Sequence, residues 1–313
     1  MKLPEHTPVP AEALAAILTR HGLGDRALVV LPDTGIINRV YRLGDDLVLR
    51  VPRNHPAHAE QARREALAAP AARAAAVRTP GLVAFDDRLD LLPVPYLLVE
   101  WSDGVPLESL GREPSDTATA WRAVGRDLAR LHHGADPTGP AGALPVGDGA
   151  PDPRELIERR ASEGWFSPVE ARWLSGWLDR LVQAAAPPAA RRLVHADVQA
   201  SNVMVGPDRE YLALIDWGCA HWGDPVIDFI GMPLRAVPFV LAGHREVAPL
   251  DGDDGAEARV VWYHLRTALW LMPRGAAPGC SWGEQPTAML LDLLRFFLED
   301  PGERWRSVGP PRS

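Results

Sequence analysis

Short apolar segments separated by turn residues dominate the first hundred residues of the chain. Three of them, 27–35, 39–44 and 46–53, are rich in Val, Leu and Tyr, with Asp, Thr and Gly residues between them. This pattern predicts an antiparallel β-meander. Two further strands are predicted over 79–87 and 95–104, because each segment has a proline near its start and an apolar run after it.

Two helices complete this first region. Residues 10–21 have apolar side chains at helical spacing, with Gly22 as a stop signal. Residues 58–76 form a second helical stretch, which carries Glu60 and Glu65. The sequence therefore predicts a small lobe of five strands with one helix inserted between the third and fourth strands.

After Gly104 the pattern becomes mainly helical. A long amphipathic helix is predicted over 117–133, a Pro- and Gly-rich loop follows it, and two more helices are predicted over 153–165 and 169–185. A strand–loop–strand segment occupies 193–216, and the tail is again mostly helical. The second part of the chain is therefore predicted to be a larger, helical lobe.

Charge and composition exclude several functions. The chain of 313 residues has a formal net charge of −8. This argues against nucleic acid as the main partner, because phosphate backbones require clustered basic surface. It favours a cationic ligand instead. Lys2 is the only lysine, so a phosphate contact that other proteins make with lysine must come from arginine here, and a Walker A motif, which needs a lysine, is excluded.

Cysteine usage and hydropathy favour a cytoplasmic protein. Cys219 and Cys280 form no CxxC or CxxH spacing, so neither a zinc site nor a disulfide framework is expected. Polar residues and prolines precede the first apolar stretch, unlike a signal peptide. The sequence contains no run of 18 apolar residues, the length expected of a membrane-spanning helix. We expect a monomer or homodimer that contacts no membrane.

The segment LVHADVQASNVMV places polar side chains between two apolar runs. Asp197 follows the first run, Asn202 precedes the second, and Asp216 ends the next run, YLALID. If 203–205 and 211–215 pair as a hairpin, Asn202 and Asp216 lie at the same end of it. Two oxygen ligands there suit Mg²⁺, which takes one or two carboxylates plus substrate phosphates. Asp197 can accept the proton of an attacking hydroxyl, so the segment predicts phosphoryl transfer.

Two linked motifs resemble the aminoglycoside phosphotransferase family, the antibiotic and small-molecule kinases with a protein-kinase-like fold. The first is H-x-D-x-x-x-x-N at 195–202, and the second is I-D-W-x(5)-G-D-P-x-x-D-F at 215–229. TGIINRVYRL is also similar to the nucleotide-loop hairpin, and PYLLVEWSDGVPL to the linker strand that holds adenine. The resemblance implies an α+β, bilobal protein-kinase-like fold, with a small β-rich N-lobe over 1–101 and a larger helical C-lobe over 102–313.

The resemblance also implies catalytic and metal-binding roles. Asp197 is expected to be the catalytic base, and Asn202 and Asp216 are expected to hold Mg²⁺. His195 is expected to be structural, bonding to backbone near the loop. Cys219 has no evident base partner, so it is expected to be a small packing residue.

The small lobe is implied to bind ATP, with GTP as a possible substitute. Arg50 stands where many relatives have the lysine that contacts ATP phosphates, and its expected carboxylate partner is Glu65, with Glu60 as the alternative. An arginine fork pairs well with a carboxylate. The other residues expected to contact the nucleotide are Thr34, Gly35 and Asn38 of the hairpin loop, and Glu100 and Trp101 through backbone groups at the adenine edge.

The acceptor is expected to be a hydroxyl of a cationic antibiotic, either an aminoglycoside or a basic peptide of the viomycin and capreomycin type. Macrolides and small metabolites are alternatives, because family resemblance does not choose among them. A nucleotide-binding pseudokinase is the alternative of another class. The missing lysine allows it, and the set of two aspartates and one asparagine argues against it.

Several residues are expected to shape the acceptor side. Asp224 and Asp228 are expected to fix their loop and cap the next helix, and both are candidates for acceptor contact. Trp262 is a further candidate, because aromatic side chains near a cleft can stack on a ring. The acidic run 251–257 is a candidate cation-binding rim.

Overall fold

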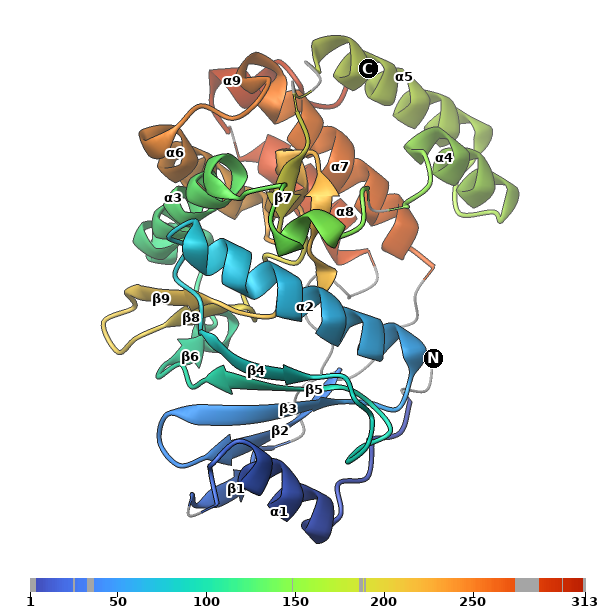
Figure 1. Ribbon diagram of the computed structural model, residues 1–313. Helices are drawn as coiled ribbons and strands as arrows, with labels where there is room; N and C mark the ends of the chain where they lie inside the picture. Colours follow the sequence, from blue (N-terminus) through green and yellow to red (C-terminus); the bar gives the residue numbers. More distant parts are fainter. Residues whose placement is uncertain are drawn as a thin grey trace.

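The computed structural model describes residues 4–24, 26–32, 37–147, 149–185, 188, 190–273, 287–299 and 301–311. The predicted nucleotide contacts Thr34 and Gly35 lie outside the described residues, as does Cys280. Figure 1 shows a β-rich lobe at the start of the chain and a larger, mainly helical lobe after it. This confirms the α+β, bilobal fold predicted from the sequence.

The small lobe is built on a five-stranded antiparallel sheet with the strand order β1-β2-β3-β5-β4. The five predicted strands and two predicted helices are all present. Their bounds are β1 (Leu28–Val30), β2 (Asn38–Leu43), β3 (Leu47–Pro52), β4 (Leu82–Asp86), β5 (Tyr96–Glu100), α1 (Ala11–Arg20) and α2 (Pro56–Ala74).

Alternation along β3 decides which side chain faces which helix, because successive residues of a strand point to opposite faces. Leu49 packs in one buried cluster with Ile17 of α1. Val48 packs on the other face with Ala62 of α2. Arg50 lies on the same face as Val48 and is thereby directed at α2. Figure 1 places α2 between the sheet and the larger lobe, so Arg50 faces the junction of the two lobes.

The larger lobe surrounds one extensive buried core. The three helices predicted before residue 190 are present, and two short strands, β6 and β10, were not predicted. The bounds are β6 (Val105–Pro106), α3 (Ala118–Gly134), α4 (Pro153–Ser162), α5 (Pro168–Ala184), β7 (Arg192–Val194), β8 (Val203–Val205), β9 (Tyr211–Leu214), β10 (His221–Gly223), α6 (Val237–Val247), α7 (Ala256–Leu271), α8 (Ala288–Leu298) and α9 (Glu303–Arg306).

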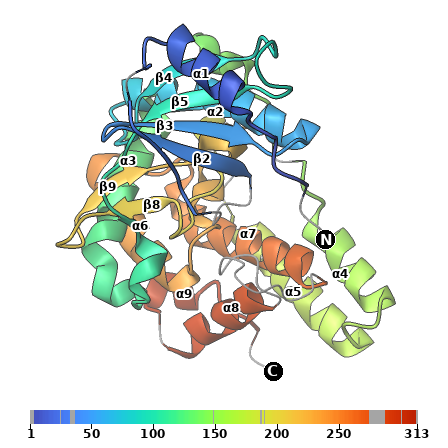
Figure 2. The ribbon, with the colours of Figure 1, turned by 90° about the horizontal axis from the view of Figure 1, so that it is seen from below.

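A glycine allows the chain to cross from β5 into the larger lobe. Gly104 has a φ of 150°, and a Cβ atom at this position would lie 2.7 Å from the carbonyl oxygen of Val205. The next strand, β6, can therefore pair with β8, which in turn pairs with β9 in the predicted hairpin. Figure 2 shows this hairpin between the five-stranded sheet and the helices. Val203 pairs with Leu214, which places Asn202 and Asp216 at the same end.

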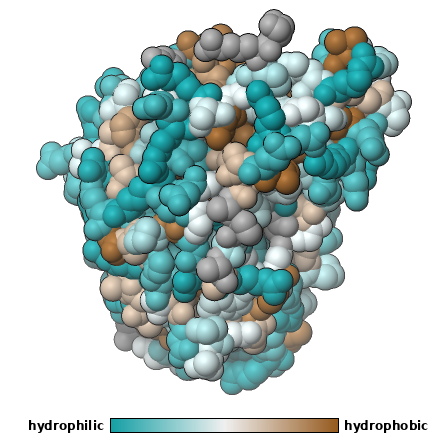
Figure 3. Space-filling view, turned by 90° about the horizontal axis from the view of Figure 1, so that it is seen from above, coloured by the Kyte–Doolittle hydropathy of each residue, from teal (hydrophilic) through white to brown (hydrophobic). Residues whose placement is uncertain are grey.

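The outer face of the larger lobe is mostly hydrophilic. Figure 3 shows apolar side chains scattered in small groups among hydrophilic ones. Within the described parts of the chain, no helix combines the length and the apolar character needed to cross a membrane.

Candidate active site

Asp228 fixes the loop that follows β7. Its side chain is fully buried, and its carboxylate accepts hydrogen bonds from the backbone N–H groups of His195 (3.1 Å) and Ala196 (2.6 Å). It also bonds to Nε2 of His132 at 2.9 Å. Ala196 has a φ of 64°, which an L residue adopts only when its surroundings hold it there. The prediction that Asp228 contacts the acceptor is wrong, because its carboxylate is enclosed by the loop it supports.

His195 has a structural role, as predicted. Its Nδ1 accepts the backbone N–H of Asp197 at 3.2 Å, so Nε2 carries the ring proton and donates it to the carbonyl oxygen of Ile215 at 3.0 Å. The ring also meets Trp217 edge-on, with 4.5 Å between centroids. Nδ1 therefore stabilises the loop itself, and Nε2 joins the loop to the residue that follows β9.

Asp197 lies on this loop with both carboxylate oxygens bound by amides. Gln199 Nε2 donates to Oδ1 at 2.5 Å, and Asn202 Nδ2 donates to Oδ2 at 2.9 Å. Burial raises the pKa of Asp197, the hydrogen bond from Gln199 opposes this, and the nearby charge of Asp216 adds to the rise. Sequence reasoning missed Gln199, since nothing in its spacing distinguishes it from other loop residues.

Arg50 links the small lobe to Asp216. It forms an ion pair with Glu65 of α2, and its Nη2 lies 3.5 Å from Asp216 Oδ1. The side chains of Arg50 and Glu65 are only 14% and 6% exposed. Burial raises the pKa of Glu65 to about 7 although the Arg50 charge opposes the rise. Glu65 is thus the partner of Arg50, and Glu60 pairs instead with Arg63 and Arg64.

Asn202 and Asp216 lie at the same end of the β8–β9 hairpin, and their binding of Mg²⁺ stays a prediction. The N–H of Ile215, beside Asp216, donates to the carbonyl oxygen of Asn202 at 3.0 Å. Asp216 has a φ of 68°, and its side chain is 27% exposed. Within the described residues, no cluster of three or more His, Cys, Asp or Glu side chains could hold a metal by itself. One carboxylate and one amide fit Mg²⁺ when substrate phosphates supply further ligands.

The described nucleotide-side residues include one unsatisfied polar atom. The side-chain oxygen of Asn38, at the start of β2, is buried and has no hydrogen-bond partner within the described residues. A buried acceptor of this kind costs free energy unless a donor reaches it. Asn38 therefore stays a candidate for contact with a bound nucleotide.

Part of the backbone predicted to face the adenine edge is used within the sheet. The N–H of Glu100 donates to the carbonyl oxygen of Gly81 at 2.9 Å, and the N–H of Trp101 donates to that of Asp46 at 2.7 Å. The Glu100 side chain binds Arg73, which is the main reason for its lowered pKa. Neither N–H is free for adenine, so only the carbonyl groups of these residues remain candidates.

Asp224 and Trp262 have other neighbours on the acceptor side. Asp224 Oδ1 accepts from Arg259 at 2.6 Å and from the N–H of Val226 at 3.0 Å, which caps the following turn. Its predicted structural role is therefore observed. Trp262 is partly buried on α7 and meets Tyr263 edge-on at 4.8 Å. An acceptor contact by Trp262 stays a prediction.

Arginines neutralise much of the acidic run 251–257. Three of its carboxylates form ion pairs, and the arginines come from three separate parts of the chain. The pairs are Asp251 with Arg192, Asp253 with Arg245 and Arg304, and Glu257 with Arg245 and Arg304. These carboxylates are poor candidates for a rim that attracts a cation.

We expect Asp228→Ala to lower the free energy of unfolding by about 3–5 kcal/mol, because it leaves two buried N–H groups and His132 without their acceptor. Burial alone would raise the pKa of Asp228, but the His132 and backbone hydrogen bonds outweigh it and lower the pKa. The stabilisation is therefore present above the ordinary pKa of 3.8 and is lost on acidification. Urea unfolding at neutral and acidic pH measures both effects.

Asp208→Ala is the matched control, since Asp208 is exposed in the turn between β8 and β9. A loss below about 1 kcal/mol in Asp228→Ala at neutral pH would contradict the proposed support of the loop.

The sequence matches a known family over most of its length. The model of the phosphotransferase enzyme family matches residues 29–259. The matched region includes Arg50, Asp197, Asn202 and Asp216. No curated protein matches the sequence significantly.

Solved structures of other proteins share the fold. The GDP complex of wild-type aminoglycoside 2′-phosphotransferase-IIIa has 16% identity and a TM-score of 0.62, and the match covers 91% of this chain and 99% of that one. Macrolide 2′-phosphotransferase from Brachybacterium faecium has 21% identity and a TM-score of 0.60, and the match covers 98% of this chain and 100% of that one. A choline/ethanolamine kinase family protein from Mesorhizobium loti has 18% identity and a TM-score of 0.59, and the match covers 95% of each chain.

Proposed function

This chain belongs to the phosphotransferase enzyme family, and we propose that it transfers the γ-phosphate of ATP to a hydroxyl group of a small molecule. One arrangement supports this most strongly. A partly buried aspartate, Asp197, lies in hydrogen-bond contact with Asn202, and Asn202 adjoins Asp216 at the end of the same hairpin. A base beside two oxygen ligands is the arrangement that phosphoryl transfer needs.

The proposed roles follow from these positions. Asp197 orients the acceptor hydroxyl and accepts its proton as the acceptor oxygen bonds to the γ-phosphorus and the bond to the ADP oxygen breaks. Asn202 and Asp216 would hold Mg²⁺, which neutralises phosphate charge when bound. Arg50 contributes a guanidinium from the small lobe, and Glu65 orients it. Catalysis then rests mainly on positioning and charge stabilisation.

We place antibiotics first among the acceptors, with resistance as the biological outcome. Proteins that share the fold include an aminoglycoside and a macrolide 2′-phosphotransferase. The net charge of −8 favours a cationic drug through long-range attraction. The acidic run adds little to this, because its carboxylates are paired with arginines. A macrolide therefore remains the main alternative.

A susceptibility panel tests the proposal. A sensitive bacterial host expressing the chain would be exposed to aminoglycosides, tuberactinomycins and macrolides, with the Asp197→Ala variant beside it. Resistance to one class that is absent with the variant would identify the acceptor class and support phosphoryl transfer. Equal susceptibility with and without the soluble, ATP-binding protein would reject antibiotics and favour a metabolite acceptor.

Arg50→Ala is expected to weaken ATP binding about 10- to 100-fold, because it removes charge-assisted bonds to phosphate and leaves Glu65 buried without its partner. Arg50→Lys should restore only part of the affinity, because one ammonium cannot reproduce a fork that meets both Glu65 and Asp216. Isothermal titration with a non-hydrolysable ATP analogue measures this. Arg63→Ala, at an exposed ion pair on α2, is the control, and unchanged affinity in Arg50→Ala would reject the phosphate contact.

A further inference from the structure

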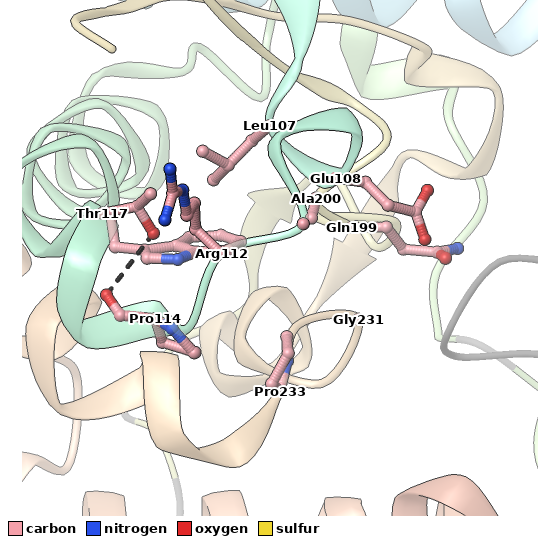
Figure 4. A pocket seen from close by; sticks show the side chains of 11 residues that line it. Leu107, Glu108, Arg112, Pro114, Thr117, Gln199, Ala200, Gly231 and Pro233 are labelled. Atoms are coloured by element: carbon pink, nitrogen blue, oxygen red, sulfur yellow. Dashed lines mark hydrogen bonds between the residues drawn. The ribbon is translucent and has the colours of Figure 1, made fainter.

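A pocket with a volume of about 150 Å³ lies beside the loop that carries Asp197. It is formed where the 3₁₀ helix Leu107–Leu110, the segment leading into α3, and the loops around residues 200 and 231 meet. Its main lining residues are Leu107, Arg112, Pro114, Trp121, Ala200 and Pro233 (Figure 4).

We propose that this pocket receives a compact apolar group of the acceptor, about the size of one six-membered carbon ring, while the acceptor hydroxyl lies at Asp197. This inference rests on the proposed function, since it assigns part of the acceptor of that same site. It names a substrate class: an alcohol with an uncharged, apolar substituent close to the hydroxyl that receives the phosphate.

The size and lining of the pocket fit such a group. A cavity of about 150 Å³ with apolar walls holds one benzene molecule. Leu107 and Trp121 are only 5% and 2% exposed, so they form fixed walls. The hydroxyl of Thr117 is directed at the carbonyl oxygen of Pro114, and Figure 4 shows this bond across one side of the pocket. The lining therefore offers mainly van der Waals contact.

The charges at the pocket disfavour a cationic group. Arg112 lies against one wall, and its guanidinium repels a positive charge. Among the described lining residues, Glu108 carries the one carboxylate. Figure 4 shows Glu108 extending away from the side where Arg112, Thr117 and Pro114 lie. An amino group of the acceptor would thus stay outside, and an apolar group would enter.

The pocket and the catalytic base belong to one compact loop. Ala200 lines the pocket, and the adjoining Gln199 donates its side-chain hydrogen bond to Asp197. Two backbone hydrogen bonds tighten the turn. The N–H of Gln199 donates to the carbonyl oxygen of Asp197 at 2.8 Å, and the N–H of Asn202 donates to the carbonyl oxygen of Gln199 at 2.9 Å. The N–H of Glu108 bonds to the carbonyl of Ala200 at 3.1 Å, which joins the opposite wall to this loop. Because the pocket wall at Ala200 and the base at Asp197 belong to one turn, the proposal places a single acceptor across both.

Benzyl alcohol is a suitable probe, since it carries one hydroxyl beside one six-membered ring. Saturation-transfer NMR with the full chain should show binding with a roughly millimolar Kd, as expected for so few atoms. Leu107→Phe fills the pocket and should raise that Kd at least about tenfold. Leu291→Phe makes the same change at an exposed site on α8 and should leave the Kd unchanged.

Activity provides the second readout. With Mg-ATP present, benzyl alcohol should increase ADP release by wild-type protein and by Leu291→Phe, but not by Leu107→Phe. Ala200→Leu, which fills the pocket from the other wall, replaces Leu107→Phe if circular dichroism shows that variant to be unfolded. Equal binding by wild type and the filled variants, no binding by wild type, or binding without any increase in ADP release would overturn the assignment.

Nucleotide titration separates this inference from the proposed function. ATP binding by the wild type, together with probe binding that the filled variants do not change, would reject only the pocket assignment. Absence of Mg-ATP binding by the folded wild type would reject the proposed function itself, whatever the probe does.

Discussion

Asp197→Asn is expected to lower kcat by about 10²- to 10⁴-fold, the range that a positioned general base contributes. The amide keeps the size of the side chain, and its oxygen can still accept the hydrogen bond from Gln199. It cannot accept the proton of an acceptor hydroxyl. Folding should change little, because the loop is held mainly by Asp228 and His195. Steady-state ADP release, with the acceptor identified by the susceptibility panel, measures the loss.

Two controls make the result specific. Asp208→Asn makes the same chemical change in the exposed turn of the neighbouring hairpin and should keep wild-type kcat. The KM for ATP should stay within about threefold in Asp197→Asn, because the base contributes to the transition state more than to nucleotide binding. A folded Asp197→Asn protein with more than about a tenth of wild-type kcat would rule out the base assignment.

The relative placement of Asp197, Asn202 and Asp216 was predictable because these residues lie close together along the chain. Asp197, Asn202 and Asp216 fall on one loop and one hairpin, so strand pairing alone brings the last two to the same end. The pairing of Arg50 with Glu65 was also predictable, because strand alternation directs Arg50 to the helix that follows β3. In both cases a local periodicity determines the direction of a side chain.

Long-range contacts account for what the sequence did not predict. Asp228 binds His132, 96 residues earlier, so its role depends on how α3 packs against the loop. Asp251 is neutralised by Arg192, 59 residues earlier. No pattern along the chain identifies either pairing, since both follow from the packing of the larger lobe.

Backbone geometry decides two details that the sequence left open. The amides of Glu100 and Trp101 belong to the sheet because its hydrogen-bonding pattern continues to the end of β5. Gln199 reaches Asp197 because of a tight turn whose entry, at Ala196, has a positive φ. A non-glycine residue in that conformation is not predictable from its type, because the surrounding hydrogen bonds impose it.

Asp216→Asn is expected to abolish most of the Mg²⁺-dependent gain in nucleotide affinity. The wild-type carboxylate supplies the charged ligand at the end of the hairpin, and the amide removes that charge with little change in shape. Asparagine is the better replacement than alanine, because Asp216 has a φ of 68°, a conformation that Asn and Asp tolerate more readily than other L residues. Folding should therefore be retained.

Titration of a non-hydrolysable ATP analogue with Mg²⁺ and with EDTA isolates the effect. Wild-type protein should bind at least about tenfold more tightly with Mg²⁺, whereas the two Kd values of Asp216→Asn should nearly coincide. In EDTA the variant should bind as well as wild type or better, because a negative charge next to the triphosphate has been removed. Asp208→Asn should behave as wild type under both conditions. If Mg²⁺ tightens binding equally in Asp216→Asn and wild type, the metal is held elsewhere, and the pairing of Asp216 with Arg50 is then its main role.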